Sequence, residues 1–422
     1  MYIKQTIGEG ISVVFEHVAS VRSVVIGVWV RAGSRYEEAG LSGISHYIEH
    51  MLFKGTEKRT ARQIAEEIEF IGGHINAFTA KDCTCFYTKT LDSHIKIAAD
   101  ILSDIILHPK LLKTDVDLER NVILEEINMY EDSPDELAHD LLAEGVWRNC
   151  PLGYPILGKP DTIARIDREA MREYLASKYT ADNIVIAVAG SFEEAELLTI
   201  LEKAFCGIRG PAPGSARDFE APGDITYEAN NYLRQKDTEQ IHLCVGYDGI
   251  GLGDDDIYAL HLANYVFGGG MSSILFQKIR EELGLVYSIY SYISAYKQAG
   301  LFTIYAGMQA EQAGRVYGMI IDELKAFTAS GMTGELLGRA KEQFKGSFIM
   351  GLESPNAKMS ALGKSELLLG YIDSPEETVR KIEDVALDKV YEIIRNIFNP
   401  DKLAVSAVGR IDGALEKTLE IK

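Results

Sequence analysis

Apolar positions along the first half of the chain predict an alternation of strands and helices. Ser12–Val30 alternates between apolar and polar residues and then runs apolar, which predicts two strands. His74–Leu91 is rich in β-branched and aromatic residues and predicts a second pair of strands. A further strand is expected at Ile184–Ala189, and helices at Ala61–Ile71, Ile95–Leu107, Val116–Tyr130 and Arg168–Tyr179. The third of these helices is expected to run on past Ser133-Pro134 toward Trp147.

The second half of the chain repeats the pattern of the first half. When the chain is shifted by 219 residues, Asp182–Gly190 (DNIVIAVAG) falls on Asp401–Gly409 (DKLAVSAVG), and Ile101 falls on Ile320. One constant offset over separate segments indicates an internal duplication. Between the copies, Gly207–Gly223 is dense in glycine and proline, which is typical of a linker.

These patterns predict an α+β fold with two duplicated domains, each a mostly antiparallel β-sheet with helices packed on it. The predicted domains are residues 1–210 and 227–422, joined by a linker at 211–226. A chain of 422 residues is longer than one hydrophobic core usually supports, which agrees with two domains.

Composition and charge place the chain among globular proteins and narrow its partners. Apolar residues make up 46% of the chain and charged residues 25%. A formal net charge of −20 argues against a nucleic-acid partner, which would need a basic surface. No signal peptide is recognised and the apolar runs are too short to span a bilayer, so we expect a cytoplasmic protein with no membrane partner. The five cysteines include no C-x-x-C pair, so neither a disulfide framework nor a thiolate zinc site is expected.

The stretch Gly43–Thr56 (GISHYIEHMLFKGT) carries the candidate chemistry. Its apolar residues recur at the spacing of a helix with one buried face, and His46, Glu49 and His50 fall together on the opposite face. Two imidazoles one helical turn apart can bind the same zinc ion, and a carboxylate beside them can reach a water on that ion. The spacing H-x-x-E-H is the inverzincin signature. The alternative interpretation is a solvated helix face that carries these residues without a metal.

A third ligand would separate the two interpretations, and the helix at Val116–Tyr130 offers two candidates. Glu119 and Glu126 are seven residues apart and therefore share one face, whereas Glu125 is turned about 100° away from Glu126. Spacing alone leaves the ligand role open between Glu119 and Glu126. In the second copy, the 219-residue shift replaces the three motif residues by Tyr265, Gly268 and Gly269. Only the first domain is therefore expected to bind metal.

The two motifs together resemble the pitrilysin family, which includes insulysin and the mitochondrial processing peptidases. The resemblance rests on His46–His50 (HYIEH), the following MLFKGT and Leu118–Glu126 (LERNVILEE); it covers nearly the whole chain and is closest to the short bacterial processing-protease-like members. It implies that Glu126 is the third zinc ligand, because the family places this ligand 76 positions after the second histidine. It also implies that Glu119 supports the site and that Glu49 is the general base of a zinc endopeptidase.

The same resemblance gives roles to two residues of the second copy. Arg280 and Tyr287 flank a Leu-Gly pair with the spacing of the family and would contact substrate or the developing oxyanion across an active chamber. The sequence departs from many relatives at Ile274, where they have arginine, which casts doubt on local substrate contacts. Family members of this length form half of a clamshell, so the resemblance implies a homodimer, with an inactive-partner heterodimer as the alternative.

One strand of the first copy is expected to bind peptide. Gly73–Thr79 (GHINAFT) resembles the substrate-binding edge strand of the family, so Asn76, Ala77 and Phe78 would bind an extended peptide through main-chain hydrogen bonds. The implied substrates are oligopeptides or unfolded, presequence-like segments. A non-catalytic peptide-binding or assembly subunit is the competing function, because some relatives have lost the zinc motif. The intact Glu49 and metal-binding pattern favour the enzyme.

Overall fold

The computed structural model describes residues 2–148, 150–210, 225–411 and 413–420, which form two compact units. Unit 1 contains Met1–Ile127, Tyr154–Gly223 and Gly351–Ile372, and unit 2 contains Asn128–Gly153, Asp224–Met350 and Asp373–Lys422. The predicted linker at 211–226 lies almost entirely outside the described residues. The predicted domains, 1–210 and 227–422, are contiguous, whereas each compact unit includes one segment from the other half of the chain.

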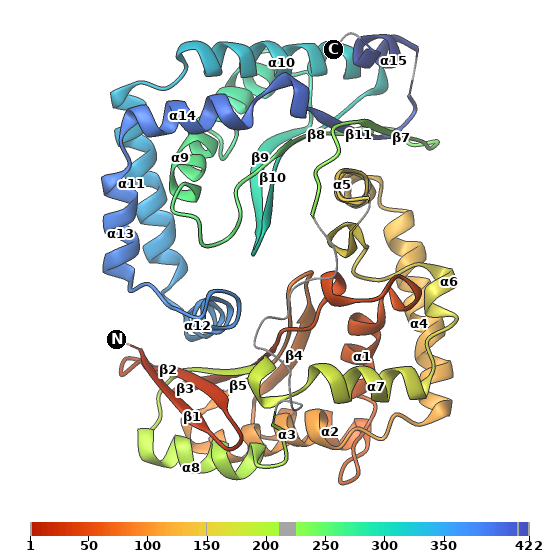
Figure 1. The fold of residues 1–422 in the computed structure, drawn as a ribbon, viewed down its shortest axis with the longest axis vertical. Coiled ribbons are helices and arrows are strands. Elements are labelled where there is room, and N and C mark those ends of the chain that lie inside the picture. The colour runs from red at the N-terminus through yellow and green to blue at the C-terminus, as the bar shows by residue number, and fades with distance from the viewer. Residues whose placement is uncertain (1, 149, 211–224, 412, 421–422) are drawn as a thin grey trace. The chain divides into compact units, whose positions relative to one another are not determined.

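Unit 1 is built on one β-sheet with the strand order β1-β2-β6-β3-β5-β4 (Figure 1). Neighbouring strands are antiparallel except β2 and β6, which run parallel. The strands are β1 (Ile3–Ile7), β2 (Ile11–His17), β3 (Ser23–Val30), β4 (His74–Thr79), β5 (Thr84–Leu91) and β6 (Ile184–Gly190). The helices are α1 (Ile44–Leu52), α2 (Ala61–Phe70), α3 (Ile95–Leu107), most of α4 (Lys113–Glu131), α6 (Pro160–Ile163), α7 (Arg168–Lys178), α8 (Glu194–Phe205) and α12 (Pro355–Leu369).

Unit 2 is built on a second sheet with the order β7-β11-β8-β10-β9, in which only β11 and β7 run parallel among the described strands. Its strands are β7 (Asn231–Gln235), β8 (Ile241–Asp248), β9 (Ser288–Tyr296), β10 (Ala299–Met308) and β11 (Ala404–Gly409). Its helices are α5 (Pro134–Val146), α9 (Ile257–Phe267), a π-helical turn (Phe276–Glu282), α10 (Ala313–Ser330), α11 (Gly334–Gly351), α13 (Pro375–Asp384), α14 (Leu387–Ile397) and α15 (Gly413–Glu420).

The two sheets are copies of one another, as the 219-residue offset predicts. With that shift, β3 falls on β8, β5 on β10 and β6 on β11, and the order β2-β6-β3-β5-β4 becomes β7-β11-β8-β10-β9. The counterpart of β1 would fall largely outside the described residues. The predicted α+β class with two duplicated, mostly antiparallel domains is confirmed.

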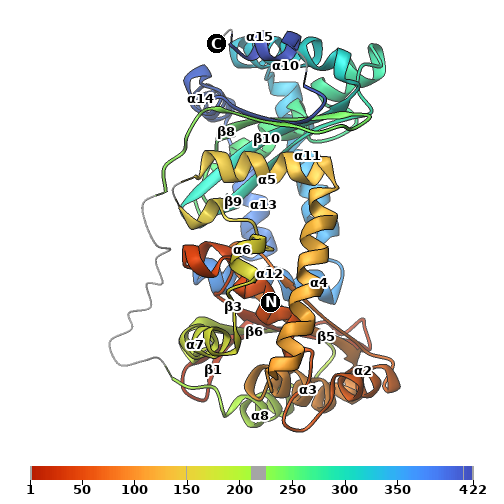
Figure 2. The same cartoon turned by 90° about the vertical axis from the view of Figure 1, so that its right-hand side faces the viewer.

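Each sheet is covered on one face by a helix from the other half of the chain. Helix α12 packs on β2, β3 and β6, and α5 packs on β8 and β11 (Figures 1 and 2). Glycine permits this close approach: a Cβ atom at Gly27 in β3 would lie 2.2 Å from Sδ of Met359, and one at Gly246 in β8 would lie 2.9 Å from Cδ2 of Leu142. Gly27 and Gly246 are equivalent under the 219-residue shift, so the same packing solution occurs on both sheets.

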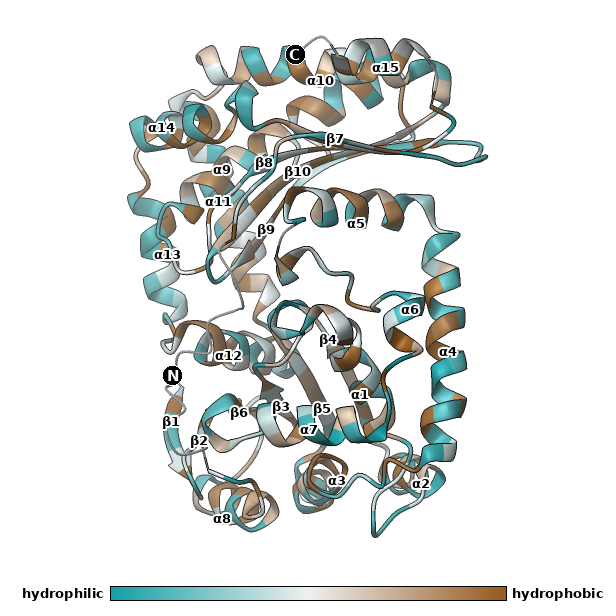
Figure 3. Cartoon of the chain, turned by 45° about the vertical axis from the view of Figure 1, so that its right-hand side comes forward, coloured by the Kyte–Doolittle hydropathy of each residue, from teal (hydrophilic) through white to brown (hydrophobic). Residues whose placement is uncertain are grey.

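Strand β3 is buried along nearly its whole length because both faces of the sheet are covered. Its even-numbered valines and isoleucine face the core that contains α3, while Gly27 and Trp29 face α12 on the other side. A strand buried on both faces carries an almost continuous apolar run. Figure 3 shows β3 and β5 largely in brown, whereas the outer helices α7 and α8 carry hydrophilic positions beside hydrophobic ones.

The helix that was expected to continue past Ser133 is two helices. Helix α4 ends at Glu131 and α5 begins at Pro134. Proline lacks the N–H that a continuing helix would need and is favoured at a helix start. The break at Ser133 lets α5 turn away and cover the sheet of unit 2. Within the described residues, none of the helices has both the length and the apolar character that crossing a bilayer requires.

Candidate metal centre

The apolar face of α1 is packed in the core of unit 1, so the opposite face, which carries the motif residues, points away from that core. The fully buried residues on that face are Ile44, Tyr47, Ile48, Met51 and Leu52. The helix begins at Gly43, whose φ of 95° lies in the left-handed region that favours glycine. The carboxylate of Glu37 accepts hydrogen bonds from the backbone N–H groups of Gly43 (2.7 Å) and Ser45 (2.8 Å). These bonds hold the first turn of α1 in place, and the motif histidines follow directly.

Helix α4 brings two carboxylates to α1. Val116, Ile123 and Ile127 of α4 are buried in the same core as the apolar face of α1, and the hydroxyl of Tyr47 donates to the carbonyl oxygen of Val116. This packing directs the face that carries the paired glutamates of α4 toward the histidines.

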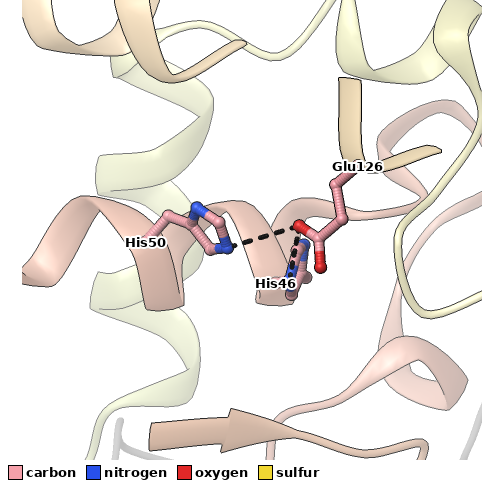
Figure 4. Close-up of side chains that lie close together, drawn as sticks. All are labelled: His46, His50 and Glu126. Atoms are coloured by element: carbon pink, nitrogen blue, oxygen red, sulfur yellow. Dashed lines mark ion pairs between the residues drawn. The ribbon is translucent and has the colours of Figure 1, made fainter. Parts of the chain in front are cut away.

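Three side chains converge between the two helices, as Figure 4 shows. Oε2 of Glu126 lies 3.7 Å from Nε2 of His46 and 3.7 Å from Nε2 of His50. The ligand atoms of these three residues all lie within 4.8 Å of one another, and no other group of this kind occurs among the described residues. Sequence spacing left the ligand role open between two glutamates; in the structure Glu126 is the one that faces both imidazoles.

The donor set fits a zinc ion. Ligand atoms about 2 Å from a tetrahedral ion are roughly 3.3 Å apart, close to the separation between the Glu126 oxygen and each imidazole nitrogen. Burial, with a smaller contribution from the neighbouring His50, lowers the pKa of His46 to about 3. This imidazole is therefore neutral at physiological pH, as a metal ligand must be. The Glu126 side chain is 33% exposed, which leaves access for water or substrate.

Glu49 lies beside the three candidate ligands and is held from the neighbouring strand. Its Oε2 accepts a hydrogen bond of 2.5 Å from the hydroxyl of Thr79, at the end of β4. Burial raises the pKa of Glu49, and the negative charge of Glu126 adds to this increase, while the hydrogen bond from Thr79 and the nearby His50 oppose it. A carboxylate whose pKa is raised by its surroundings suits a group that takes up and releases a proton.

Glu119 contacts the far side of His50. Its Oε1 lies 3.0 Å from Nδ1 of His50, and its Oε2 lies 2.5 Å from Nζ of Lys54. The carboxylate is almost fully buried, with 7% of the side chain exposed. An acceptor at Nδ1 places the imidazole proton on that nitrogen and leaves the lone pair of Nε2 directed toward Glu126.

Strand β4 is the edge of its sheet and runs beside α1. It pairs with β5 on one side, and no described strand pairs with its other side. Asn76 and Phe78 are exposed, and the ring of Phe78 meets the buried ring of Trp29 edge-on, with 5.6 Å between the ring centroids. Ala77 is half-buried between them and donates its backbone N–H to the side chain of Asn76. The predicted peptide-binding residues thus lie on an open strand edge that ends at the partner of Glu49.

Arg280 and Tyr287 belong to unit 2, where they line one pocket together with Gly268–Gly270. The Arg280 guanidinium lies over the ring of Phe276 at 4.6 Å, and the Tyr287 side chain is 77% exposed. The Arg280 side chain is 40% exposed, so both side chains are accessible from solvent. The glycines form a turn that precedes the π-helical segment.

Sequence reasoning missed three residues that hold the candidate site together. Thr79 holds Glu49, Lys54 holds Glu119, and Glu37 holds the start of α1. Lys54 and Thr79 lie inside stretches that the motifs already single out, but their partners come from other elements. No motif singles out Glu37. Its partners are backbone N–H groups in the first turn of α1, on the far side of a loop, and backbone groups leave no mark on the sequence.

Comparison with protein families identifies two matches in this chain. Residues 12–160 match the family described as insulinase (peptidase family M16), and residues 165–344 match the peptidase M16 inactive domain. An uncharacterized zinc protease of Bacillus subtilis is 43% identical over 401 residues, which cover 95% of this chain and 97% of that protein. One of Streptomyces coelicolor is 37% identical, over 93% of this chain and 86% of its own length.

Two solved structures have the same fold. A structure described as a peptidase M16 inactive domain from Pseudomonas fluorescens superposes with a TM-score of 0.89 at 20% identity and covers 98% of each chain. A protease from Helicobacter pylori gives a TM-score of 0.89 at 19% identity, over 97% of this chain and 99% of its own.

Proposed function

Because the chain belongs to the insulinase family of peptidases, family M16, we propose that it is a zinc-dependent endopeptidase. The observation that carries this proposal is the convergence of His46 and His50 from α1 with Glu126 from α4, with Glu49 beside them. Two imidazoles, one carboxylate and an adjacent unligated carboxylate are the parts that a catalytic zinc site requires. A purely structural zinc site would require a fourth protein ligand, and among the described residues the group of mutually close ligand atoms contains only these three.

In this mechanism His46, His50 and Glu126 would hold the ion, which when bound would polarise the peptide carbonyl and lower the pKa of a water molecule. Glu49 takes the proton from the attacking water and then delivers it to the leaving amine. Thr79 orients the Glu49 carboxylate for both transfers. Glu119 keeps His50 in the tautomer that directs Nε2 to the ion.

The proposed substrates are oligopeptides and unfolded, presequence-like segments. An extended peptide can add to the open edge of β4 through main-chain hydrogen bonds, which accept many sequences. Since β4 ends at Thr79, such a peptide would run toward Glu49. This supports Asn76, Ala77 and Phe78 as peptide-binding residues.

We further propose a homodimer in which Arg280 and Tyr287 of one copy complete the site of the other. Both side chains are exposed and share a pocket, which supports a role in binding substrate. A dimer of this kind has two equivalent sites. The described cysteines are free thiols, which suits the cytoplasm as the compartment.

The direct test is incubation with a mixed peptide library, with and without a chelator, read by mass spectrometry. We expect cleavage that stops on zinc removal and returns when zinc is restored. Glu49→Gln should bind zinc like the unsubstituted protein and lose about 10²-fold or more in kcat. Cleavage that survives metal removal would refute the zinc mechanism. Peptide binding without any cleavage would instead support a non-catalytic binding subunit.

A further inference from the structure

Lys54 lies just beyond the end of α1 and faces the metal centre from behind His50. Its ammonium group is 2.5 Å from Oε2 of Glu119, whose other oxygen is 3.0 Å from Nδ1 of His50. The three side chains thus form a continuous row that ends at the Nε2 atom facing Glu126. Lys54 and His50 come from one segment, whereas the carboxylate between them comes from α4.

We propose that Lys54 is a positioning residue of the metal centre, which through Glu119 fixes the orientation of His50 and so increases the affinity for zinc. The inference rests on the proposed zinc site and extends it to a residue outside the ligand motif. Lys54 would touch neither the ion nor the substrate.

The geometry of the carboxylate explains why two partners are needed. A carboxylate with one partner can rotate about its last bonds, whereas one held at both oxygens has its plane fixed. Glu119 is 7% exposed, and a buried charge is costly unless it is paired and hydrogen-bonded. Lys54 supplies the paired charge and leaves Oε1 free to accept from His50. Loss of Lys54 would allow the Glu119 carboxylate to turn away from the imidazole.

His50 depends on this row more than His46 does. The His46 side chain is 9% exposed, so packing alone restricts its ring, and its Nδ1 has no hydrogen-bond partner among the described residues. The His50 side chain is 23% exposed and therefore has less packing to hold it. The orientation of one of the two imidazoles thus relies on Glu119, and that of Glu119 on Lys54.

The test compares zinc affinity in Lys54 variants, measured by competition with a chromophoric chelator. Lys54→Met removes the charge and keeps the length, and we expect its zinc affinity to fall about tenfold, as for other residues that orient metal ligands. Lys54→Arg keeps the charge and should restore affinity to within about threefold. Lys58→Met is the matched control, because Lys58 pairs with Asp100 and Asp104 away from the ligands and should leave affinity unchanged.

A double-mutant cycle separates positioning from a general structural effect. If Lys54 acts through Glu119, Lys54→Met should cost no further affinity in a Glu119→Gln background. The thermal unfolding of the metal-free variants gives a readout independent of activity. Lys54→Met should lower the unfolding temperature where Glu119 is present, because it leaves this buried carboxylate without its paired charge, and should have little effect in the Glu119→Gln background. Zinc affinity is therefore compared at a temperature at which every variant is folded. Should Lys54→Met fail to fold, Lys54→Gln takes its place in the cycle.

Two outcomes would overturn the inference: wild-type zinc affinity in Lys54→Met, or an equal loss of affinity with and without Glu119. Either result in a protein that binds zinc and cleaves peptides would leave the proposed function intact. Absence of zinc binding in the unsubstituted protein would refute the proposed function itself, so the two failures are distinguishable.

Discussion

Two adjacent glutamates on α4 have different surroundings, and the difference decides which of them can bind metal. Glu126 faces both imidazoles, with its Oε2 at 3.7 Å from each. Glu125 is turned by about 100° on the helix, so it cannot share that position. Which of the two glutamates can be the third ligand is therefore decided by its angular position on α4.

This contrast gives a matched pair of variants. Glu126→Gln replaces a charged ligand with a weak neutral one, and we expect its zinc affinity to fall by about 100-fold or more. Glu125→Gln removes the same charge one position away and should bind zinc within about twofold of the unsubstituted protein, since it loses only a screened long-range attraction. Both affinities can be measured by chelator competition at one ionic strength. Equal losses in the two variants would show that net charge and not coordination is responsible.

At the scale of elements, the start of α1 depends on a carboxylate that is buried. Burial raises the pKa of Glu37 from 4.5 to about 7, although the hydrogen bonds from Ser45 and Gly43 favour the ionised form. The folded state therefore holds this proton more tightly than the unfolded state does. Its contribution to stability is complete below about pH 4.5 and is lost as the pH rises through 7.

We therefore expect the stability of the metal-free protein relative to Glu37→Gln to depend on pH. From pH 5 to pH 8 the free energy of unfolding of the unsubstituted protein should fall by about 2 kcal/mol relative to the variant. Denaturant unfolding at a series of pH values measures this difference, and groups common to both proteins cancel. A difference that stays constant over this range would show that Glu37 does not titrate there.

The close packing of α12 on the sheet of unit 1 depends on glycine. A Cβ atom at Gly363 would lie 2.1 Å from Nε1 of Trp29, so Gly363→Ala should push α12 away from β3 and destabilise the protein by about 1–3 kcal/mol. Gly338 in α11 has no neighbour within 4 Å of such an atom, so Gly338→Ala should be neutral or stabilise by up to about 1 kcal/mol. Thermal unfolding of the two variants makes the comparison. Destabilisation by both would point to a backbone effect of glycine replacement instead of packing.

At the scale of the whole molecule, the duplication separates two sets of candidate functional residues. The candidate metal ligands and Glu49 lie in unit 1, whereas Arg280 and Tyr287 lie in unit 2. The second copy keeps the sheet but has Tyr265, Gly268 and Gly269 where the first copy has its motif. Under the proposed function, the first copy would hold the metal and the second would supply residues that contact the substrate.

The proposed dimer can be tested by complementation. Glu49→Gln and Arg280→Ala should each be nearly inactive alone. If Arg280 acts on the site of the partner copy, one of the two sites in every mixed dimer is intact, so a randomly mixed equimolar sample should recover about a quarter of full activity. Peptide cleavage after subunit exchange measures the recovery. A mixture as inactive as its components, with exchange confirmed, would show that Arg280 does not act across the dimer.

The two-copy architecture and the motif residues follow from the order of amino acids along the chain. Strong apolar periodicity predicted the strands β2 to β6, and one constant offset predicted a second sheet, because local pattern and repetition are properties of the chain alone. His46, Glu49 and His50 followed from helical spacing. The resemblance to known peptidases chose Glu126 where spacing could not.

The pairing of distant residues is known only from the folded chain. The exchange of α5 and α12 between the sheets, with Gly27 and Gly246 facing them, could not be read from spacing, because each contact joins residues from opposite halves of the chain. The contacts of Thr79 with Glu49 and of Lys54 with Glu119 lie within the first half of the chain, but each joins two separate elements and could not be read from spacing either. Periodicity tells which face of an element is buried. Which partner lies against that face depends on the path of the chain between them.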